Sequence, residues 1–479
     1  MSQVQMIEMP AEKLPVFDEA DVVVVGGGSS GFLAAVAAAR TGANTLLIER
    51  HGYLGGCSTA PYNTSIGWFG DSHDQLIIRG LPMEYLQRME RDGQAFITRN
   101  GTKNQIWPPY TKKIAFDMVE EAGVNLWLHS WAYDVVMDGD VLKGVVIQTK
   151  GGRGIMLGKT FVDTSADADI AAWCGAPNQV EDIENIQQVS CDYIACGVDS
   201  AQVVEWARAN KDRLDLKVKG LEVDNKEGGA QSMFTITIPK DSSDFVSQES
   251  FHVGWMPTVK LCIYREAVRI QGNSDINPLD PRALTRAEVD GLRGAIDHLN
   301  FMKDNVPGFE NAFIVSQAHL GVRESRQIIG DYYITIDDAK SEAHFDDVVA
   351  LNCRALDYHL KGTVFKISFL ERAHDIPLRA LLPQGVENLV VGGRCISCDH
   401  LSQASIRGAA TCMATGHAAG TSAAVAALNG QFMRDVDIRQ IQRKLIEQDA
   451  ILSVIDGREP WLGAPATVRE STTESLAAV

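Results

Sequence analysis

A glycine-rich turn close to the N-terminus constrains the fold of this chain most strongly. Val22 to Val25 are consecutive β-branched residues, the pattern of a strand buried on both faces. Gly26, Gly28 and Gly31 follow in the G-x-G-x-x-G spacing. The alanine-rich residues after them predict a helix that ends at a C-cap, Gly42.

The next residues complete a recognisable unit. Residues 45–48 predict a second strand, which ends at an acid, Glu49. Strand, glycine turn, helix, strand and acid together predict a dinucleotide-binding βαβ unit. In such a unit Gly26 permits the tight turn, Gly28 lets the backbone approach a pyrophosphate, and Gly31 brings the helix close to the strand. The helix N-terminus attracts phosphates, and Glu49 is placed to accept hydrogen bonds from ribose hydroxyls.

Composition excludes some functions. The chain has 479 residues, enough for two or three domains, and a formal net charge of −18. The acidic balance and the absence of a basic block argue against binding to nucleic acid, including the rival hypothesis of a protein that acts on tRNA. Nine scattered cysteines favour reduced thiols, and residues 1–19 do not resemble a signal peptide, so we expect a cytoplasmic protein without a membrane span.

A second pair of glycines narrows the ligand class. Gly55 and Gly56 follow the ribose-binding acid and let the backbone pass close to a large flat ligand, as flavin enzymes commonly require. Residues 151–154 are also rich in glycine, but a strand follows them, so they predict a hairpin turn. The sequence therefore has no second dinucleotide motif for NAD(P)H.

The remaining segments predict alternating elements. Residues 124–136 and 141–149 predict a hairpin, and residues 181–375 differ in composition and suggest an inserted substrate domain. A long helix of small residues is predicted over about 402–428, and an amphipathic helix over 436–448. The polar last residues predict a tail or a docking arm.

Together these motifs resemble the FAD-dependent oxidoreductases of the glutathione-reductase/fumarate-reductase type, whose flavoproteins contain a two-dinucleotide-binding-domain arrangement. The resemblance covers nearly the whole chain. It rests on Gly26 to Gly31, Glu49 with Arg50, Gly55 with Gly56, Val162 to Asp167, His319 to Arg326, Ile376 to Pro383, Asn388 to Ser397 and Ser405 to Gly420.

The resemblance implies an α/β fold. A Rossmann-like FAD-binding domain, with a parallel sheet, helices and a small antiparallel meander, is interrupted by an α+β substrate domain. The expected boundaries are 1–19 for an N-terminal arm, 20–180 and 376–430 for the two parts of the FAD-binding domain, 181–375 for the insert and 431–479 for a C-terminal helix and tail.

The resemblance also assigns the cofactor site. The early glycines would hold the pyrophosphate, and Gly393 with Arg394 would lie by the ribityl chain. A helix that begins near Ser405 and Ile406 would direct its N-terminus at the flavin. The expected FAD-binding residues are Gly26, Gly28, Ser29, Ser30, Gly31, Glu49, Arg50, Gly55, Gly56, Cys57, Ala132, Ser165, Gly393, Arg394, Ser405 and Ile406.

Candidate catalytic residues come from the insert and its end. His359 and His374 are possible bases because the pKa of histidine lies near neutrality, although either could be structural. Arg323, with Arg326, could bind a carboxylate or brace the insert in ion pairs. Arg379 could stabilise reduced flavin or form a structural pair.

The predicted function is oxidation of a small organic substrate, as a dehydrogenase or an oxidase, by hydride transfer to flavin N5. Oxygen, a quinone or a partner protein would reoxidise the flavin, and a homo-oligomer is possible. Two alternatives stay open: a thiol/disulfide flavoenzyme that uses Cys395 and Cys398, and an FAD-bearing electron-relay subunit of a complex. The spacing of cysteines and histidines predicts no metal site.

Overall fold

The computed structural model describes most of the chain in a few long stretches and several short ones. Two features predicted from the sequence, the catalytic candidate His359 and the tail at 459–479, lie outside the described residues. The described residues are 7, 10–63, 66–73, 75–97, 104–209, 237–238, 249–250, 252–256, 261–265, 268–269, 276–358 and 366–453.

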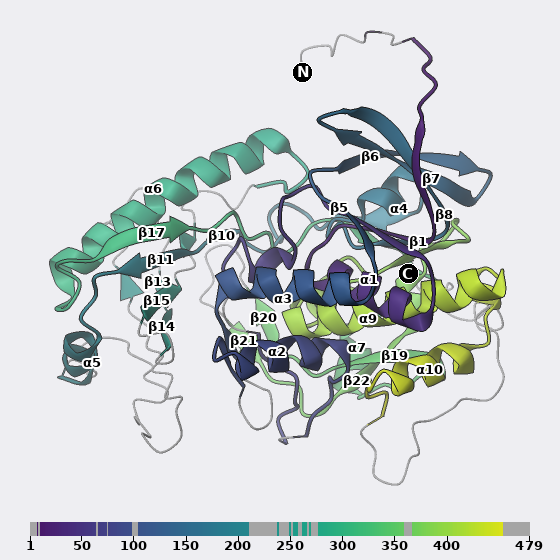
Figure 1. Ribbon diagram of the computed structural model, residues 1–479. Coiled ribbons are helices and arrows are strands. Elements are labelled where there is room, and N and C mark those ends of the chain that lie inside the picture. Colours follow the sequence, from purple (N-terminus) through teal and green to yellow (C-terminus); the bar gives the residue numbers. More distant parts are fainter. Residues whose placement is uncertain are drawn as a thin grey trace.

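A seven-stranded sheet forms the centre of the fold (Figure 1). Its strand order is β5-β2-β1-β8-β7-β6, and β23 pairs with β8. The pairs among β5, β2, β1, β8 and β23 are parallel, whereas β6 and β7 add an antiparallel meander. The bounds are β1 Val16–Val25, β2 Thr45–Ile48, β5 Asn125–Trp127, β6 Trp131–Asp138, β7 Val141–Thr149, β8 Gly152–Asp163 and β23 Leu389–Val391.

The long strand β8 joins the early and late parts of the chain. Its first half pairs with β7 and its last residues pair with β23, while β1 runs along its other edge. Asn388 reinforces this junction because its side chain bonds the backbone of Leu142 and Lys159. The sheet is therefore complete only when residues near 390 return to residues near 160.

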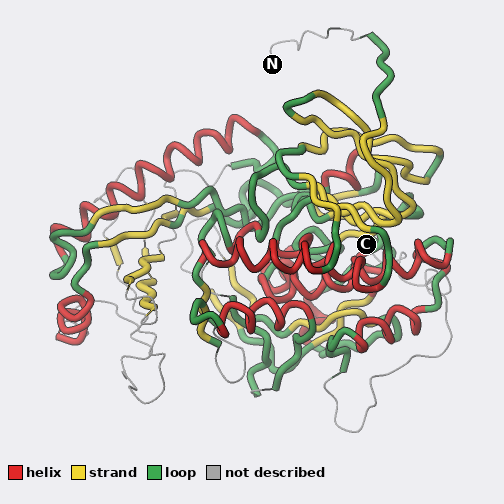
Figure 2. The backbone as a smooth tube through the Cα atoms, in the orientation of Figure 1, coloured by secondary structure: helices red, strands yellow, loops and turns green. Residues whose placement is uncertain are grey.

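Two helices rich in small residues pack below this sheet (Figure 2). The helix α9 (Ala409–Asn429) is buried along most of its length and contacts α1 (Ser29–Thr41), β1, β8 and β19. A Cβ atom at Gly416 would lie 2.2 Å from the carbonyl oxygen of Ser30, and one at Gly420 would lie 2.0 Å from that of Ala34. Only glycine permits two helix backbones to approach this closely.

Other helices and short strands surround this centre. The bounds are η1 Gly56–Ser58, α2 Leu81–Arg91, β3 Ala95–Phe96, β4 Gln105–Ile106, α3 Pro108–Glu121, α4 Asp169–Trp173, β9 Asn178–Gln179, β18 Gln327–Ile328, α7 Ile336–Lys340, β19 Val348–Asn352, β20 Leu356–Tyr358, β21 Lys366–Ser368, β22 His374–Pro377, η4 Leu378–Leu381, α8 His400–Ile406, η5 Met433–Asp435 and α10 Ile438–Glu447.

A second, smaller group of elements extends to the left in Figure 1. The helix α6 (Pro281–Asn305) begins at the N-cap Asp280 and packs against β17 (Phe313–Gln317), which pairs with β11 (Tyr193–Cys196). These elements have their own buried cluster, which includes Phe309 and Met302. The others are β10 Ser190–Cys191, α5 Ser200–Ala209, β12 Thr237–Ile238, β13 Glu249–Ser250, β14 His252–Met256, β15 Leu261–Arg265 and β16 Val268–Arg269.

The large core reaches beyond the two segments expected to form the FAD-binding domain. Buried residues between Ile328 and Ala373 belong to the same cluster as the main sheet. These residues lie inside the expected insert of 181–375. The domain boundaries stay predictions. The packing shows that part of the expected insert shares the main core.

Three expected elements differ from the structure. The single helix expected over 402–428 is two helices, because the chain turns at Arg407 and Gly408. The strand expected over 124–136 is β5 and β6, separated by a turn in which His129 has a φ of 53°. The strand β1 begins at Val16, inside the expected arm, where it pairs with the early part of β8.

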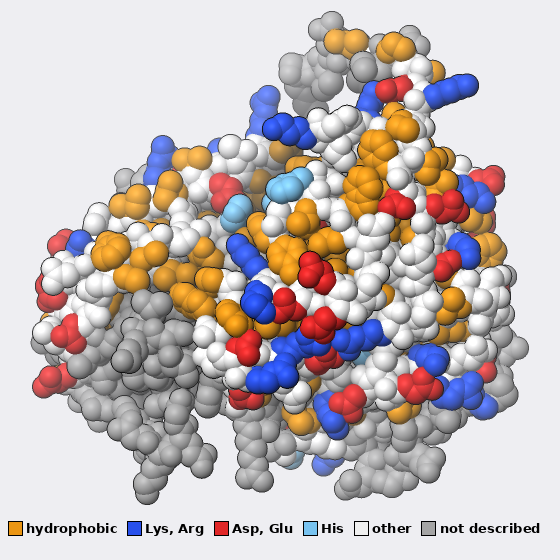
Figure 3. Space-filling view, in the orientation of Figure 1, with side chains coloured by type: hydrophobic (Ala, Val, Ile, Leu, Met, Phe, Trp, Pro, Cys, Tyr) orange, Lys and Arg blue, Asp and Glu red, His pale blue; other side chains and the backbone are white. Residues whose placement is uncertain are grey.

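The visible surface carries mixed charge. Figure 3 shows Lys and Arg side chains next to Asp and Glu side chains across the middle of this face. Pairs on α1, α2 and α3 include Arg40–Glu84, Arg88–Glu121 and Lys113–Asp117. Within the part of the chain that the structure describes, no helix is long and apolar enough to span a bilayer.

We expect Gly420→Ala to lower the free energy of unfolding by about 1–3 kcal/mol, because the new methyl group would overlap the backbone of α1. An exposed helix would instead gain up to about 1 kcal/mol from the same exchange. Thermal or denaturant unfolding measures the change. Gly151→Ala is the control, because the nearest atom to its Cβ is 3.7 Å away, and an equal effect of both substitutions would contradict the packing argument.

Candidate functional site

The glycine turn leaves the start of α1 open. The N-cap residue Gly28 has a φ of −66°, and no described side chain caps the helix. Gly26 has a φ of 98°, and a Cβ at Gly31 would lie 1.7 Å from the carbonyl oxygen of Gly26. The first backbone N–H groups of α1 therefore lack helical acceptors and point out of a tight turn, which is a site for an anion.

Glu49 lies directly beside the turn. Its carboxylate accepts hydrogen bonds from the backbone N–H groups of Gly27 and His51, each at 2.7 Å. Burial raises the pKa of this carboxyl group, and the two backbone donors oppose that change. The Glu49 carboxylate is thus held at the end of β2, where the ribose of a dinucleotide would lie if its pyrophosphate were at the glycine turn.

The second glycine pair returns to the same turn. Ser29 donates a hydrogen bond of 2.8 Å to the carbonyl oxygen of Gly55. A Cβ at Gly56 would lie 2.9 Å from the Cα of Gly28. The exposed side chain of Cys57 has its sulfur 3.6 Å from Ser29 Oγ. Residues 55–57 therefore pack directly against the start of α1.

The late part of the chain also packs against the start of α1. Positions for a Cβ at Gly392 and Gly393 lie 3.1 and 3.4 Å from Ser30 Oγ. Gly393 has a φ of 98°, and its N–H donates to Thr415 Oγ1 at 3.0 Å. Ser30 Oγ is buried and has no hydrogen-bond partner among the described residues. An unpaired hydroxyl beside uncapped helix N–H groups fits a phosphate-bearing cofactor.

Arg394 lies in an ion pair. Its guanidinium contacts Asp167 at 2.5 Å and Ser325 at 2.9 Å, and Ser325 also bonds Asp167. Ser165 is held at the end of β8 by the buried carboxylate of Asp163. These contacts connect the late strand, the end of β8 and the segment that contains Ser325.

Two further expected cofactor residues lie near the end of β2. Arg50 is exposed, with its guanidinium 5.3 Å from the centre of the Trp131 ring. Ala132 is the next residue along β6 and is half-buried. Both lie on the side of the sheet edge where Glu49 ends β2.

The late helix is placed differently from the expectation. Ser405 and Ile406 end α8 rather than begin a helix, and both are buried. The Ser405 hydroxyl bonds the carbonyl oxygen of Arg354 and accepts from Asn352 at 2.8 Å. The helix start next to the cleft is α9, whose N-cap is Gly408. A turn at Arg407 and Gly408 was not visible in a sequence of small helix-compatible residues.

The expected catalytic residues are mostly held in structural contacts. His374 is fully buried, its two ring nitrogens contact Asn352 and the carbonyl oxygen of Asp375, and burial lowers its pKa to about 4. Arg379 pairs with Asp347 at 3.0 and 3.2 Å. Arg323 donates to the carbonyl oxygen of Gln188 at 2.5 Å. Their catalytic roles stay predictions.

The two cysteines of the C-x-x-C sequence are buried free thiols. Gln327 bonds the sulfur of Cys398 at 3.0 Å, and burial raises the pKa of Cys395 and Cys398 well above the ordinary value. Such thiols are poor nucleophiles because the thiolate is the reactive form. Within the described part of the chain, no group of three or more His, Cys, Asp or Glu could hold a metal ion.

A histidine that the sequence analysis missed lies at the start of α8. His400 Nδ1 is 2.7 Å from Glu324 Oε1, and the carboxylate of Glu324 also accepts from the N–H of Gln187 at 3.0 Å. Burial lowers the pKa of His400, but the bond to Glu324 and the charges of Glu324, Glu181 and Asp399 raise it overall. A sequence signal existed, since His400 follows the late glycine pair by a few residues.

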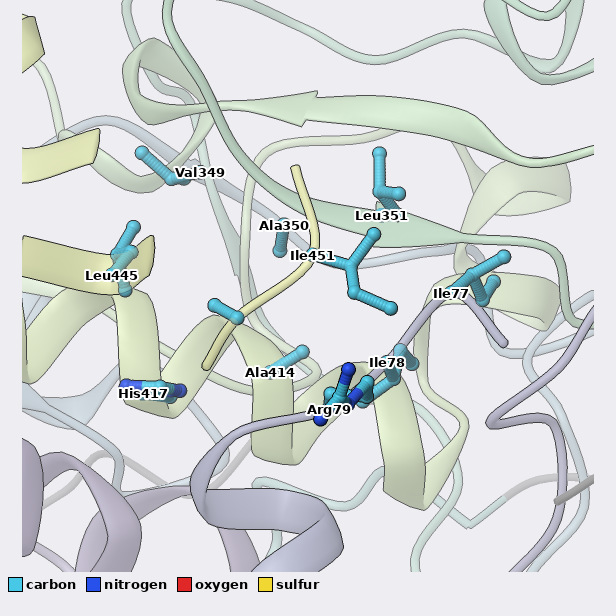
Figure 4. A pocket seen from close by; sticks show the side chains of 11 residues that line it. Ile77, Ile78, Arg79, Val349, Ala350, Leu351, Ala414, His417, Leu445 and Ile451 are labelled. Carbon is cyan, nitrogen blue, oxygen red and sulfur yellow. The ribbon is translucent and has the colours of Figure 1, made fainter. Parts of the chain in front are cut away.

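A small pocket lies elsewhere. Figure 4 shows Ile77, Ile78, Leu351 and Ile451 among the side chains that line it. Its volume is about 10 Å³, which is room for roughly one water molecule. It is too small for a dinucleotide and lies apart from the glycine turn.

Comparison with protein families gives one match. A family model described as FAD dependent oxidoreductase matches residues 21–445. A dihydrolipoyl dehydrogenase from Trypanosoma brucei brucei is 52% identical over 42 residues, which are 9% of this chain and 9% of that protein. The chain thus aligns with only a small part of this relative.

The solved structures that match this chain have low sequence identity to it. A geranylgeranyl bacteriochlorophyll reductase-like protein from Thermoplasma acidophilum is 14% identical, with 91% of this chain and 84% of that chain covered and a TM-score of 0.43. A flavoprotein/dehydrogenase from Cytophaga hutchinsonii is 13% identical, with 90% and 84% covered and a TM-score of 0.41.

We expect Gly28→Ala to separate folding from cofactor binding. A Cβ at this position meets only the Cα of Gly56, at 4.0 Å, and the φ of −66° suits alanine. The free energy of unfolding of the apoprotein should change by less than about 0.5 kcal/mol. The methyl group would occupy the space for a pyrophosphate, so the dissociation constant for FAD should rise by about tenfold or more.

Flavin fluorescence during reconstitution of the apoprotein measures this constant. Gly151→Ala, in an exposed turn, is the matched control and should bind FAD as the original protein does. Equal FAD affinity for Gly28→Ala and the control would show that the phosphates do not lie at this turn.

Proposed function

This chain belongs to the family of FAD-dependent oxidoreductases, and we propose that it oxidises a small organic substrate by hydride transfer to the flavin. It is an enzyme, and FAD is its cofactor. The observation that best supports the site is the unpaired Ser30 hydroxyl between the early glycine turn and the late glycine pair.

Different residues of this site would bind different parts of FAD. The start of α1, with Gly28 and Ser30, would hold the pyrophosphate, and Glu49 would hold the ribose of the adenosine. The backbone at Gly56 and at Gly393 would lie along the central part of the FAD molecule. When bound, FAD supplies an electron sink that accepts a hydride at N5.

His400 is the acid–base group that we assign to this reaction. Oxidation of a C–H bond beside a hydroxyl or amine requires removal of a proton from the heteroatom. The His400 side chain is 19% exposed, whereas that of Glu324 is fully buried. Glu324 fixes the orientation of the imidazole and stabilises its protonated form, so the free nitrogen Nε2 can take the proton.

The electron acceptor is part of the proposal. The sequence has one glycine turn of the dinucleotide-binding type, followed by a strand and an acid. Reoxidation therefore falls to oxygen, a quinone or a partner protein rather than to a nicotinamide bound at a second site of the same type.

Anaerobic bleaching tests the proposed reaction. The purified yellow protein would be mixed with panels of alcohols, amines and hydroxy acids while the flavin absorbance near 450 nm is followed. We expect one class of compound to bleach the flavin and oxygen, or an added quinone, to restore the colour. A holoenzyme that dithionite reduces and that no panel compound bleaches would count against oxidation of a small organic substrate.

The pH dependence of bleaching tests the role of His400. The base must be unprotonated, and its pKa is raised, so the rate should rise with pH through a value above the ordinary histidine pKa of about 6.5. Glu324→Gln removes the main raising interaction, while burial still lowers the pKa. The rising limb should therefore move to lower pH by about one pH unit or more.

Glu181→Gln is the matched control, because its carboxylate is 3.8 Å from His400 rather than 2.7 Å and should shift the profile less. His400→Ala should lower the rate by roughly 10²- to 10⁴-fold. A profile that is the same in Glu324→Gln and the original enzyme would exclude His400 as the titrating base.

A further inference from the structure

We propose that Arg354 and Arg407 form a subsite that binds a carboxylate group of the substrate. This inference rests on the proposed function, because it names the chemical class of the molecule that the flavin oxidises. The two side chains were not candidates in the sequence analysis. They come together because the chain turns between α8 and α9.

Arg407 has an unsatisfied donor in a buried place. Its side chain is 10% exposed, and its Nη2 atom donates to the backbone oxygen of Asp357 at 2.8 Å and contacts Asp357 Oδ2 at 3.3 Å. Its Nε atom is buried and has no acceptor among the described residues. Burial lowers the pKa of Arg407 to about 10, which reflects the cost of a buried charge that is incompletely paired.

Arg354 meets Arg407 at the same carboxylate. Its Nη2 atom contacts Asp357 Oδ2 at 2.5 Å, and Nη1 donates to the carbonyl oxygen of Ala404 at 2.5 Å. The aliphatic part of the side chain lies against Gly408, where a Cβ would be 2.2 Å from Arg354 Cδ. Two guanidinium groups thus share the carboxylate of Asp357, and the pair retains capacity for a second anion.

Arg434 shows that a buried arginine in this protein can have an acceptor for each of its nitrogen atoms. Arg434 is also 10% exposed. Its Nε and Nη2 atoms bind the two carboxylate oxygens of Asp331 at 2.7 and 3.2 Å, and its Nη1 atom donates to Val386 at 2.7 Å. Arg434 is a structural arginine with every nitrogen paired, and Arg407 differs from it in this respect.

The pair lies beside the wall of the cofactor cleft. Arg407 immediately precedes Gly408, the N-cap of α9. Cys412, one turn into α9, lies within electrostatic range of Arg354 and Arg407 and also of Cys57 and Arg394. Glu324, the partner of His400, also lies within electrostatic range of Arg407. An anion held here would place a substrate between the acid–base group and the cleft.

The chemistry of the donors favours a carboxylate. A guanidinium presents parallel N–H groups that match the two oxygens of a planar carboxylate. Asp357 already occupies one edge of both arginines and fixes their orientation, which lowers the entropy lost on binding. The subsite would therefore select hydroxy acids, amino acids or similar organic acids over neutral alcohols and amines.

Binding of simple carboxylates to the oxidised holoenzyme tests the inference without turnover. Acetate and benzoate would be titrated while the visible flavin spectrum is recorded, with acetamide and benzamide as neutral probes of the same shape. We expect saturable spectral shifts with the acids and at least about tenfold weaker binding of the amides. Arg407→Met and Arg354→Met should weaken acid binding by roughly tenfold to a hundredfold.

Matched variants make the outcome decisive. Arg434→Met removes an equally buried arginine and should leave acid binding unchanged. Arg407→Lys keeps the positive charge, so it can be measured if Arg407→Met does not bind FAD. Unchanged acid binding in Arg407→Lys and Arg354→Met, equal binding of acids and amides, or preferred binding of inorganic phosphate or sulfate would overturn the inference.

The two proposals can fail separately. If acids bind in a way that depends on Arg407 but no compound bleaches the flavin, the proposed reaction is wrong and the subsite is supported. Bleaching by a neutral alcohol or amine, unaffected in Arg407→Lys and Arg354→Met, would keep the reaction and remove the subsite.

Discussion

The close contact between the backbones of α1 and α9 is the constraint on which the rest of the structure depends. Gly416 and Gly420 bring α9 against Ser30 and Ala34 at distances that no Cβ would permit. This contact fixes the late chain beside the glycine turn, and the pairing of β23 with β8 fixes it from the other side. The cofactor cleft exists because residues 26–31, 55–57 and 392–393 are held against one another by these packed layers. A Rossmann-like unit thus obtains its second wall from residues more than 300 positions later.

The same packing explains where buried charge can act. Other buried ionic groups form ion pairs, as Arg379 does with Asp347 and Arg434 with Asp331. Such pairs brace the late part of the chain. His400 with Glu324 lies instead at the start of α8, where the carboxylate raises the pKa of the histidine. Arg407 with Arg354 lies at the α8–α9 turn, where Arg407 Nε has no acceptor among the described residues. These two features set α8 and the turn that follows it apart as the place for chemistry.

Local patterns predicted the early βαβ unit well. The β-branched strand, the glycine spacing and the Gly42 C-cap all act over short distances, and β1, α1 and β2 confirm them. The α8–α9 turn was missed because Ser405 to Gly420 is rich in small residues that suit a continuous helix. The close contact between Arg354 and Gly408 at this break joins residues 54 positions apart, so it was not visible in the local pattern. His400 and Arg407 were missed because their partners Glu324 and Asp357 are 76 and 50 residues away along the chain. His374 was chosen for its neutral-range pKa, which complete burial lowers to about 4.

The central claim is that one FAD spans both parts of the chain. A crystal structure of the oxidised holoenzyme tests it most directly. The account predicts the pyrophosphate at the N-terminus of α1 within hydrogen-bond distance of Ser30 Oγ, the adenosine ribose at Glu49, and the flavin ring between Gly56 and the start of α9. A flavin bound outside this cleft, or a pyrophosphate that leaves Ser30 Oγ unpaired, would contradict the account.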